Sequence, residues 1–163
     1  MTIKCISPID GSIYAERPTL SRSDADAAVT RAKIAQKKWN MHPIKERIEL
    51  VKAGVAAIGA MNAEIVPEIA WQMGRPIRYG GEFGGFNERA SYMADIAIDA
   101  LAPIEIENSD NFRRVIKRVP HGLVLVVAPW NYPFMTAINT VAPALIAGNA
   151  VMLKHASQTP LVG

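Results

Sequence analysis

The sequence predicts an α/β fold, and three observations support it. Periodic apolar residues indicate helices over much of residues 1–102, and alternating apolar and charged residues then indicate two strands within 103–120. The apolar runs at 123–128 and 150–153 flank a helical segment and are typical of parallel strands covered on both faces. Strand, helix and strand with short links form a right-handed βαβ unit. We therefore expect a helical layer, a hairpin and a βαβ unit within 121–163.

The composition describes a globular chain. Half of the 163 residues are hydrophobic, 20% are charged, and the formal net charge is +3. Such a chain collapses around a core, which excludes a disordered polymer. The single cysteine excludes a disulfide framework and multi-cysteine metal sites, and we expect no metal. The sequence contains no signal-like segment and no apolar run of about 18 residues, so we expect a cytoplasmic protein without membrane contacts.

Start and stop signals place the first elements. Asp10-Gly11 is a turn signal between two short extended pieces. Ser23 and Asp26 resemble a capping box at the start of a helix that ends near Asn40. The first helix is therefore expected to follow a pair of short strands.

Three further helices follow. Pro43 suits the first turn of the second helix, and Asn62 is placed to cap a third helix that Gly74 ends. A longer helix follows the glycines of 80–85 and ends before Pro103. The second helix has the cleanest apolar face, formed by Ile44, Ile48, Val51, Val55 and Ile58.

Residues 104–107 and 112–119 predict two solvent-faced strands joined by a turn at 108–111. The basic pairs at 113–114 and 117–118 could in principle contact nucleic acid. Only Phe112 lies nearby to stack on a base, and no nucleic-acid-binding motif accompanies it. We therefore favour a solvated strand face, or a strand that pairs with another subunit, and expect no nucleic-acid partner.

Ligands of open parallel sheets bind beyond the carboxyl ends of the strands, which directs attention to two segments. After the first strand, Pro129 and Pro133 stiffen the chain around Trp130 and Asn131. Trp130 offers a flat apolar wall, and the amide of Asn131 could donate a hydrogen bond to an oxyanion. The alternative is that Asn131 caps the helix that begins here.

After the second strand, Lys154 could hold a hydroxyl or phosphate of a nucleotide, or could be an ordinary surface lysine. No GxGxxG or Walker-type glycine loop follows either strand, and the glycines of 80–85 do not have that spacing. Ser157 or Thr159, with Pro160, is expected to begin another helix. With only two buried strands, the chain is expected to be cut off within a domain.

Other candidate residues carry weaker signals. His42, His121 and His155 lack metal-ligand spacing. Cys5 has no visible base or helix start to activate it, which favours an inert thiol over a nucleophile.

Several sequence blocks together carry a resemblance to a known family. They are residues 127–133 (VAPWNYP), 142–145 (APAL), 147–149 (AGN), Lys154 and 158–160 (QTP), with 7–11 (SPIDG), Trp39, Arg47 and 74–77 (GRPI) before them. In motif and spacing, the whole chain resembles the N-terminal half of the NAD(P)-dependent aldehyde dehydrogenase superfamily. The resemblance implies an incomplete aldehyde dehydrogenase fold: a helical part of the cofactor-binding domain (1–102), oligomerisation strands (103–120) and the first βαβ unit of a Rossmann-like parallel sheet (121–163).

The resemblance also implies roles for individual residues. In this family a cysteine thiolate attacks the aldehyde, the thiohemiacetal gives hydride to NAD or NADP, and a glutamate activates the water that hydrolyses the thioester. Asn131 would be the oxyanion donor. The residues that would contact the cofactor are Val127, Ala128, Pro129, Trp130, Lys154, His155, Ala156 and Ser157.

Ser157 stands where NAD-using members commonly have glutamate, and His155 replaces a frequent proline. A carboxylate would repel the 2′-phosphate of NADP, whereas Ser157 beside the cation of Lys154 removes that repulsion. Use of NADP is therefore plausible alongside NAD.

In the family, the catalytic cysteine and glutamate both lie beyond the part that matches this chain. We therefore expect these 163 residues alone to be inactive, and the full-length protein to be a homo-oligomer, a dimer or tetramer, that acts on an aldehyde. One alternative is a non-catalytic fragment that pairs with a full-length relative through its strands. An acylating or acyl-phosphate-reducing relative is a further alternative, but the Pro-Trp-Asn motif favours hydrolytic aldehyde oxidation.

Overall fold

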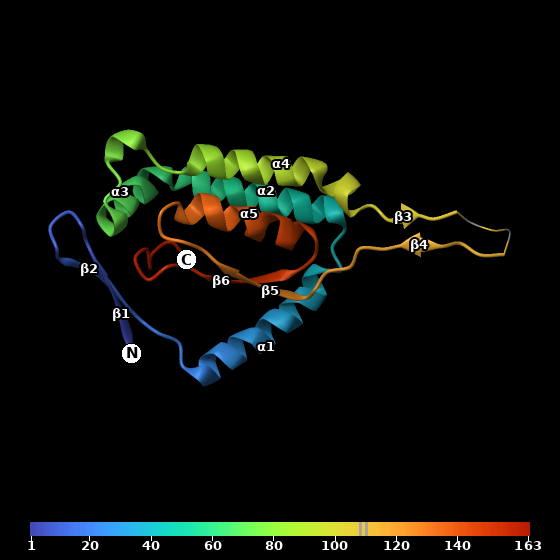
Figure 1. Ribbon diagram of the computed structural model, residues 1–163, viewed down its shortest axis with the longest axis horizontal. Helices are drawn as coiled ribbons and strands as arrows, with labels where there is room; N and C mark the ends of the chain where they lie inside the picture. The colour runs from blue at the N-terminus through green and yellow to red at the C-terminus, as the bar shows by residue number, and fades with distance from the viewer. Residues whose placement is uncertain (108, 110) are drawn as a thin grey trace.

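The computed structural model describes residues 1–107, 109 and 111–163. Helices α2, α4 and α5 form one layer, and the two-stranded parallel sheet of β5 and β6 lies beside them (Figure 1). Helix α1 lies on the other side of this sheet. A narrow hairpin projects from one end, and the chain's N-terminal hairpin lies towards the other. The α/β class predicted from the sequence is confirmed.

The chain begins with strands β1 (Thr2–Ile6) and β2 (Ile13–Pro18), which pair antiparallel around a turn where Gly11 has φ 75°. Helix α1 (Arg22–Trp39) starts two residues earlier than the expected capping box. Ser21 and Asp24 form the box, and the Asp24 amide donates to Ser21 Oγ at 3.1 Å. The Ser23 and Asp26 prediction is wrong because Ser23 already lies inside the helix.

The apolar core lies among α2 (Ile44–Ala60), α4 (Phe83–Leu101) and α5 (Pro133–Ile146). Helix α3 (Asn62–Met73) and the short helix η1 (Ile77–Tyr79) connect α2 to α4. Asn62 is the first residue of α3 and provides no side-chain cap, whereas Gly74 ends the helix with φ 79°, as predicted. The buried core residues are Ile48, Val51, Val55, Phe86, Ala90, Ala94, Ala97, Ile138, Ala142 and Ile146.

The βαβ unit consists of β5 (Leu123–Val127), α5 and β6 (Ala150–Lys154), with the two strands parallel. The sequence predicts that both faces of β5 are covered, and this prediction is wrong for part of the strand. Val126 is 5% exposed, but Leu125 and Val127 are 62% and 66% exposed. Because side chains alternate between the faces of a sheet, one face at this end of β5 lacks a covering element within the described residues.

The segment after β6 was expected to begin a helix, but it folds into turns. The Thr159 amide donates to Ala156 O at 3.2 Å, and Thr159 itself is fully buried. The predicted helix start at Ser157 or Thr159 is therefore wrong, because the local backbone bonds span three residues instead of the four of an α-helix.

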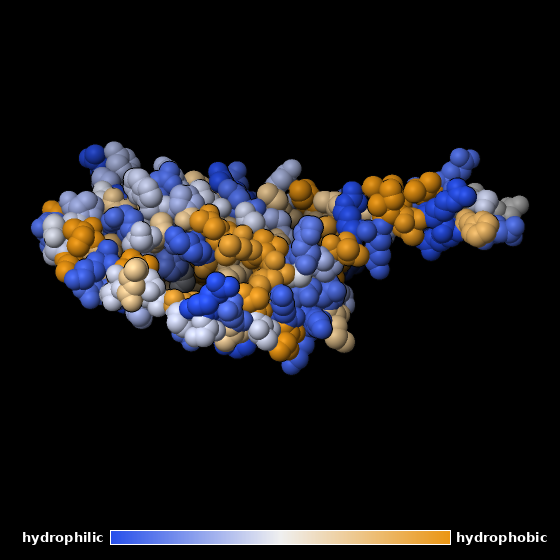
Figure 2. Space-filling view, turned by 60° about the horizontal axis from the view of Figure 1, so that its bottom comes forward, coloured by the Kyte–Doolittle hydropathy of each residue, from blue (hydrophilic) through white to orange (hydrophobic). Residues whose placement is uncertain are grey.

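The projecting hairpin contains β3 (Ile104–Glu105) and β4 (Val115–Ile116), paired antiparallel with Ile104 opposite Ile116. Arg113 forms an exposed ion pair with Glu105. The predicted turn at 108–111 includes Asn108 and Asp110, which lie outside the described residues. Figure 2 shows apolar side chains gathered on the hairpin. Its exposed apolar residues are Ile104, Ile106, Phe112, Val115, Ile116 and Val119.

Side chains of α1 and α2 donate hydrogen bonds to the turn between α5 and β6. Trp39 Nε1 donates to Leu145 O at 2.7 Å, and Arg47 Nε donates to Ile146 O at 2.9 Å. Gln36 Nε2 donates to Gly148 O at 2.8 Å, where Gly148 has φ 90°. Leu145 O and Ile146 O belong to the last turn of α5, where carbonyls lack the usual intrahelical partner. The three donors join α1 and α2 to the βαβ unit.

Two glycine substitutions should change stability in opposite directions. Gly74→Ala places a Cβ at φ 79° and 3.0 Å from Pro8 Cγ, so we expect a loss of about 1–2 kcal/mol in unfolding free energy. Gly54→Ala lies within α2 with no atom near its Cβ position, so we expect a gain of about 0.5–1 kcal/mol. Chemical denaturation measures both, and a shift in the same direction would contradict the assigned backbone roles.

Candidate functional site

The carboxyl ends of the two parallel strands lie side by side. The Ala128 amide donates to Lys154 O at 3.0 Å, which continues the ladder one step beyond the pairing of Val127 with Lys154. The two segments selected from the sequence therefore leave the sheet at the same edge. This is the edge at which open parallel sheets bind ligands.

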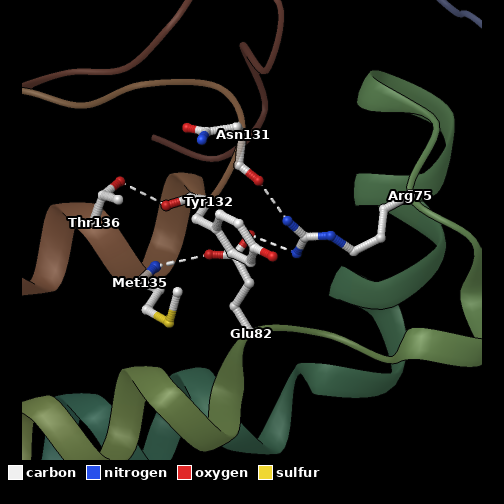
Figure 3. Close-up of polar contacts among 6 residues, drawn as sticks. All are labelled: Arg75, Glu82, Asn131, Tyr132, Met135 and Thr136. Carbon is white, nitrogen blue, oxygen red and sulfur yellow. Dashed lines mark hydrogen bonds and ion pairs between the residues drawn. The ribbon is translucent and has the colours of Figure 1, made fainter.

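Asn131 is exposed in the loop between β5 and α5. Tyr132 occupies the N-cap position of α5, and no side chain at that position caps the helix, so the alternative of Asn131 as a cap finds no support. Figure 3 shows the side-chain amide of Asn131 pointing away from Arg75, while its backbone carbonyl points towards Arg75. The amide is thus left available to a ligand.

A buried ion pair holds the loop between β5 and α5 in place. Arg75 Nη1 lies 2.7 Å from Glu82 Oε1, and their side chains are 12% and 2% exposed. Arg75 Nη2 donates to Asn131 O, and the guanidinium lies 4.5 Å from the centre of the Tyr132 ring. Glu82 Oε2 accepts the Met135 amide at 2.8 Å (Figure 3). Sequence reasoning missed this pair, although Arg75 belongs to a motif that carries the family resemblance.

Trp130 forms one wall of a hollow beside the loop. It is 51% exposed. A cavity of about 370 Å³ lies between Trp130, Gln158 and residues of the N-terminal part of the chain, namely Ile6, Pro8 and Met73. The flat apolar wall predicted from the sequence is therefore accessible.

The segment after β6 carries the cation of Lys154 and the hydroxyl of Ser157. Lys154 and Ser157 are exposed, whereas His155 and Ala156 are half-buried. His155 Nδ1 lies 3.3 Å from Ala156 O, so its ring is turned towards the local backbone. Residues 127–131 and 154–158 contain no aspartate or glutamate. This edge of the sheet therefore suits a ligand with phosphate or hydroxyl groups.

Cys5 lies on β1 and is fully buried, next to the segments that contain Gln72 and Gln158. Its Sγ donates to Gln158 O at 3.1 Å and contacts Gln72 O at 3.7 Å. Burial, with a smaller contribution from the nearby Glu68 carboxylate, raises the pKa of the Cys5 thiol. The thiol is therefore protonated and shielded, which is the opposite of an activated nucleophile.

The described residues contain no group of three or more His, Cys, Asp or Glu side chains placed to hold a metal ion. No single helix in the described part of the chain has the length and apolar composition of a membrane span; α2 and α3 meet that test only as a pair bent by 69°.

The fold and this edge define a class: the chain contains part of a parallel α/β domain, with ligand-accessible groups at the carboxyl ends of β5 and β6. Its sequence matches the aldehyde dehydrogenase family over residues 1–163, and the chain belongs to that family.

Individual relatives agree with this assignment. The chain is 30% identical over 162 residues to D-glyceraldehyde dehydrogenase (NADP(+)) of Picrophilus torridus, covering 98% of this chain and 33% of that protein. It is 33% identical over 169 residues to benzaldehyde dehydrogenase [NAD(+)] of Pseudomonas putida, covering 97% and 33%.

Solved structures show the same fold. The NADP-dependent glyceraldehyde-3-phosphate dehydrogenase of Bacillus halodurans, complexed with NADP, superposes with a TM-score of 0.90 at 30% identity, covering 100% of this chain and 36% of that one. A NAD-dependent benzaldehyde dehydrogenase of Corynebacterium glutamicum superposes with a TM-score of 0.90 at 31% identity, covering 100% and 35%. The chain spans about a third of the length of these relatives and has that part of the aldehyde dehydrogenase fold.

The buried thiol should resist alkylation. A raised pKa means less thiolate at any given pH, so iodoacetamide at pH 8 should modify Cys5 at least tenfold more slowly in the folded protein than in denaturant. Mass spectrometry of timed samples measures the two rates. Equal rates in the folded and unfolded protein would contradict the burial of this thiol.

Proposed function

We propose that the protein of which this chain is a part oxidises an aldehyde to a carboxylic acid with NAD or NADP, and that Asn131 stabilises the oxyanion. Family membership supports the reaction class. The observation that carries the role of Asn131 is its exposed side-chain amide at the carboxyl end of β5, on a loop whose backbone is fixed by Arg75. A donor held in place before the reaction stabilises developing negative charge without the cost of reorganising solvent.

The chemistry assigns Asn131 a single task. A cysteine outside these 163 residues forms a bond to the aldehyde carbon, and the carbonyl π electrons move to oxygen. The Asn131 Nδ2–H group donates a hydrogen bond to that oxygen while it is negative. With NAD or NADP bound as the hydride acceptor, collapse of the oxyanion would release hydride from the carbon, and water would then free the acid from the resulting thioester with help from a glutamate, also outside these residues. Cys5 cannot substitute for the nucleophile because it is buried and protonated.

The cofactor supplies the hydride acceptor when it is bound. Lys154 would donate to its ribose hydroxyl or phosphate oxygens, with Ser157 exposed close along the chain. Val127, Ala128, Pro129 and Trp130 would line the cleft from the first strand, and His155 and Ala156 from the second. The exposed cation and the lack of acidic residues in both segments support a phosphate-bearing ligand.

We also propose that the projecting hairpin joins copies of the protein into a dimer or tetramer. Its two short strands leave six large apolar side chains exposed on a two-stranded element, which is not stable in isolation. Burial of those side chains against another subunit would remove this exposure. The same surface would serve in pairing with a full-length relative if the chain acts as a non-catalytic partner.

Loss of the proposed oxyanion donor should reduce turnover. In an active enzyme that contains this chain, Asn131→Ala should lower kcat about 10²- to 10³-fold, as removal of one such donor does. Asn87→Ala, an exposed asparagine on α4, is the matched control and should leave kcat within about twofold. Steady-state kinetics with a saturating aldehyde measure both. An unchanged kcat in Asn131→Ala would refute the assigned role.

A new carboxylate beside Lys154 should disfavour NADP. Ser157→Glu should lower the ratio of kcat/KM for NADP to that for NAD about tenfold or more, because the carboxylate repels the 2′-phosphate. Ser157→Gln matches the size without the charge and should change the ratio much less. Initial rates with each cofactor give the ratios, and a similar drop in both variants would show that charge is not the cause.

A further inference from the structure

We infer that Arg75 is a positioning residue for the oxyanion donor: it fixes the backbone of Asn131, and Glu82 holds Arg75 in place. This inference rests on the proposed function of Asn131. Arg75 lies 56 positions before Asn131 in the sequence.

Arg75 holds the middle of the loop, which is less restrained than its two ends. The rings of Pro129 and Pro133 fix their own φ angles, and the Thr136 amide donates to Tyr132 O at 2.9 Å, so the backbone at Trp130 and Asn131 keeps more freedom. Arg75 Nη2 donates to Asn131 O. Because the peptide unit is planar, holding that oxygen orients the whole peptide between Asn131 and Tyr132. It therefore also limits the direction in which the Asn131 side chain leaves the loop.

The guanidinium is itself held on three sides. Nη1 lies 2.7 Å from Glu82 Oε1, Nη2 meets Asn131 O, and the plane lies over the Tyr132 ring at 4.5 Å. A planar fork sets a fixed angle between its two hydrogen bonds, whereas a lysine ammonium on a flexible stem cannot reproduce both bonds together with the ring contact. The identity of the side chain as arginine therefore matters, beyond its charge.

Glu82 also holds the start of helix α5. Its second oxygen accepts the Met135 amide at 2.8 Å, in the first turn of α5, where the helix has no side-chain cap of its own. The loop is thus tied through Arg75 on one side of Tyr132 and through Glu82 on the other (Figure 3). An oxyanion donor depends on such placement, since a shift of about 1 Å costs roughly 10²-fold in rate.

A double-mutant cycle tests the inference in an active enzyme that contains this chain. Arg75→Lys alone should lower kcat at least tenfold while the KM for NAD or NADP changes less than about threefold. In the Asn131→Ala background, where no donor remains to be positioned, Arg75→Lys should lower kcat less than about twofold. Glu82→Gln replaces one carboxylate oxygen with an amide nitrogen, so the side chain no longer has an oxygen for Arg75 and another for the Met135 amide. It should show the same dependence on Asn131, which provides a second variant if Arg75→Lys does not fold.

Arg47→Lys is the matched control. Arg47 also donates to backbone carbonyls, of Ile146 and His42, but it lies at the opposite end of α5 from Asn131. Any loss of kcat that it causes should be the same in both backgrounds. The inference is overturned if Arg75→Lys has no effect, or if it lowers kcat by equal factors with and without Asn131. If Asn131→Ala alone leaves kcat unchanged, the proposed function fails first, and the inference fails with it.

Discussion

The buried ion pair between Arg75 and Glu82 is the contact on which the site depends. It lies where α3, α4 and the loop before α5 meet, and each partner uses a second atom on that loop or helix. A buried ion pair adds little net stability, because removing two charges from water offsets their attraction. Its contribution here is geometric: two segments distant in sequence are held in a single arrangement. Losing one partner would leave the other charge buried without compensation, which is far more costly than losing the pair's net attraction.

The site is also held by the core that α2, α4 and α5 share. Helix α5 carries the site loop at its N-terminus and the turn into β6 at its C-terminus, whereas the pairing of β5 with β6 sets the spacing between the two candidate ligand-binding segments. Trp39, Arg47 and Arg75 all precede the βαβ unit in the chain, and all donate to its backbone oxygens. The segments from α1 to η1 therefore act as a scaffold for the βαβ unit.

Local patterns predicted the elements well, because helix periodicity, Gly74 and the two apolar strands are short-range signals. Asn131 and Lys154 could be selected as candidates because parallel strands place their carboxyl ends at one edge. The capping box was displaced by two residues because Ser21 and Ser23 offer similar caps in neighbouring registers. The exposed face of β5 could not be predicted, since an apolar sequence does not state what covers it. The Arg75–Glu82 pair was missed because its effect on Asn131 depends on tertiary contacts that no local pattern records.

The most direct test is a crystal structure of an active enzyme that contains this chain, with an aldehyde trapped covalently on its catalytic cysteine. We predict that Asn131 Nδ2 lies about 3 Å from the substrate oxygen, while Arg75 still bonds both Asn131 O and Glu82. A substrate oxygen that receives its hydrogen bonds from other groups, with the Asn131 side chain turned away, would contradict the role proposed for Asn131.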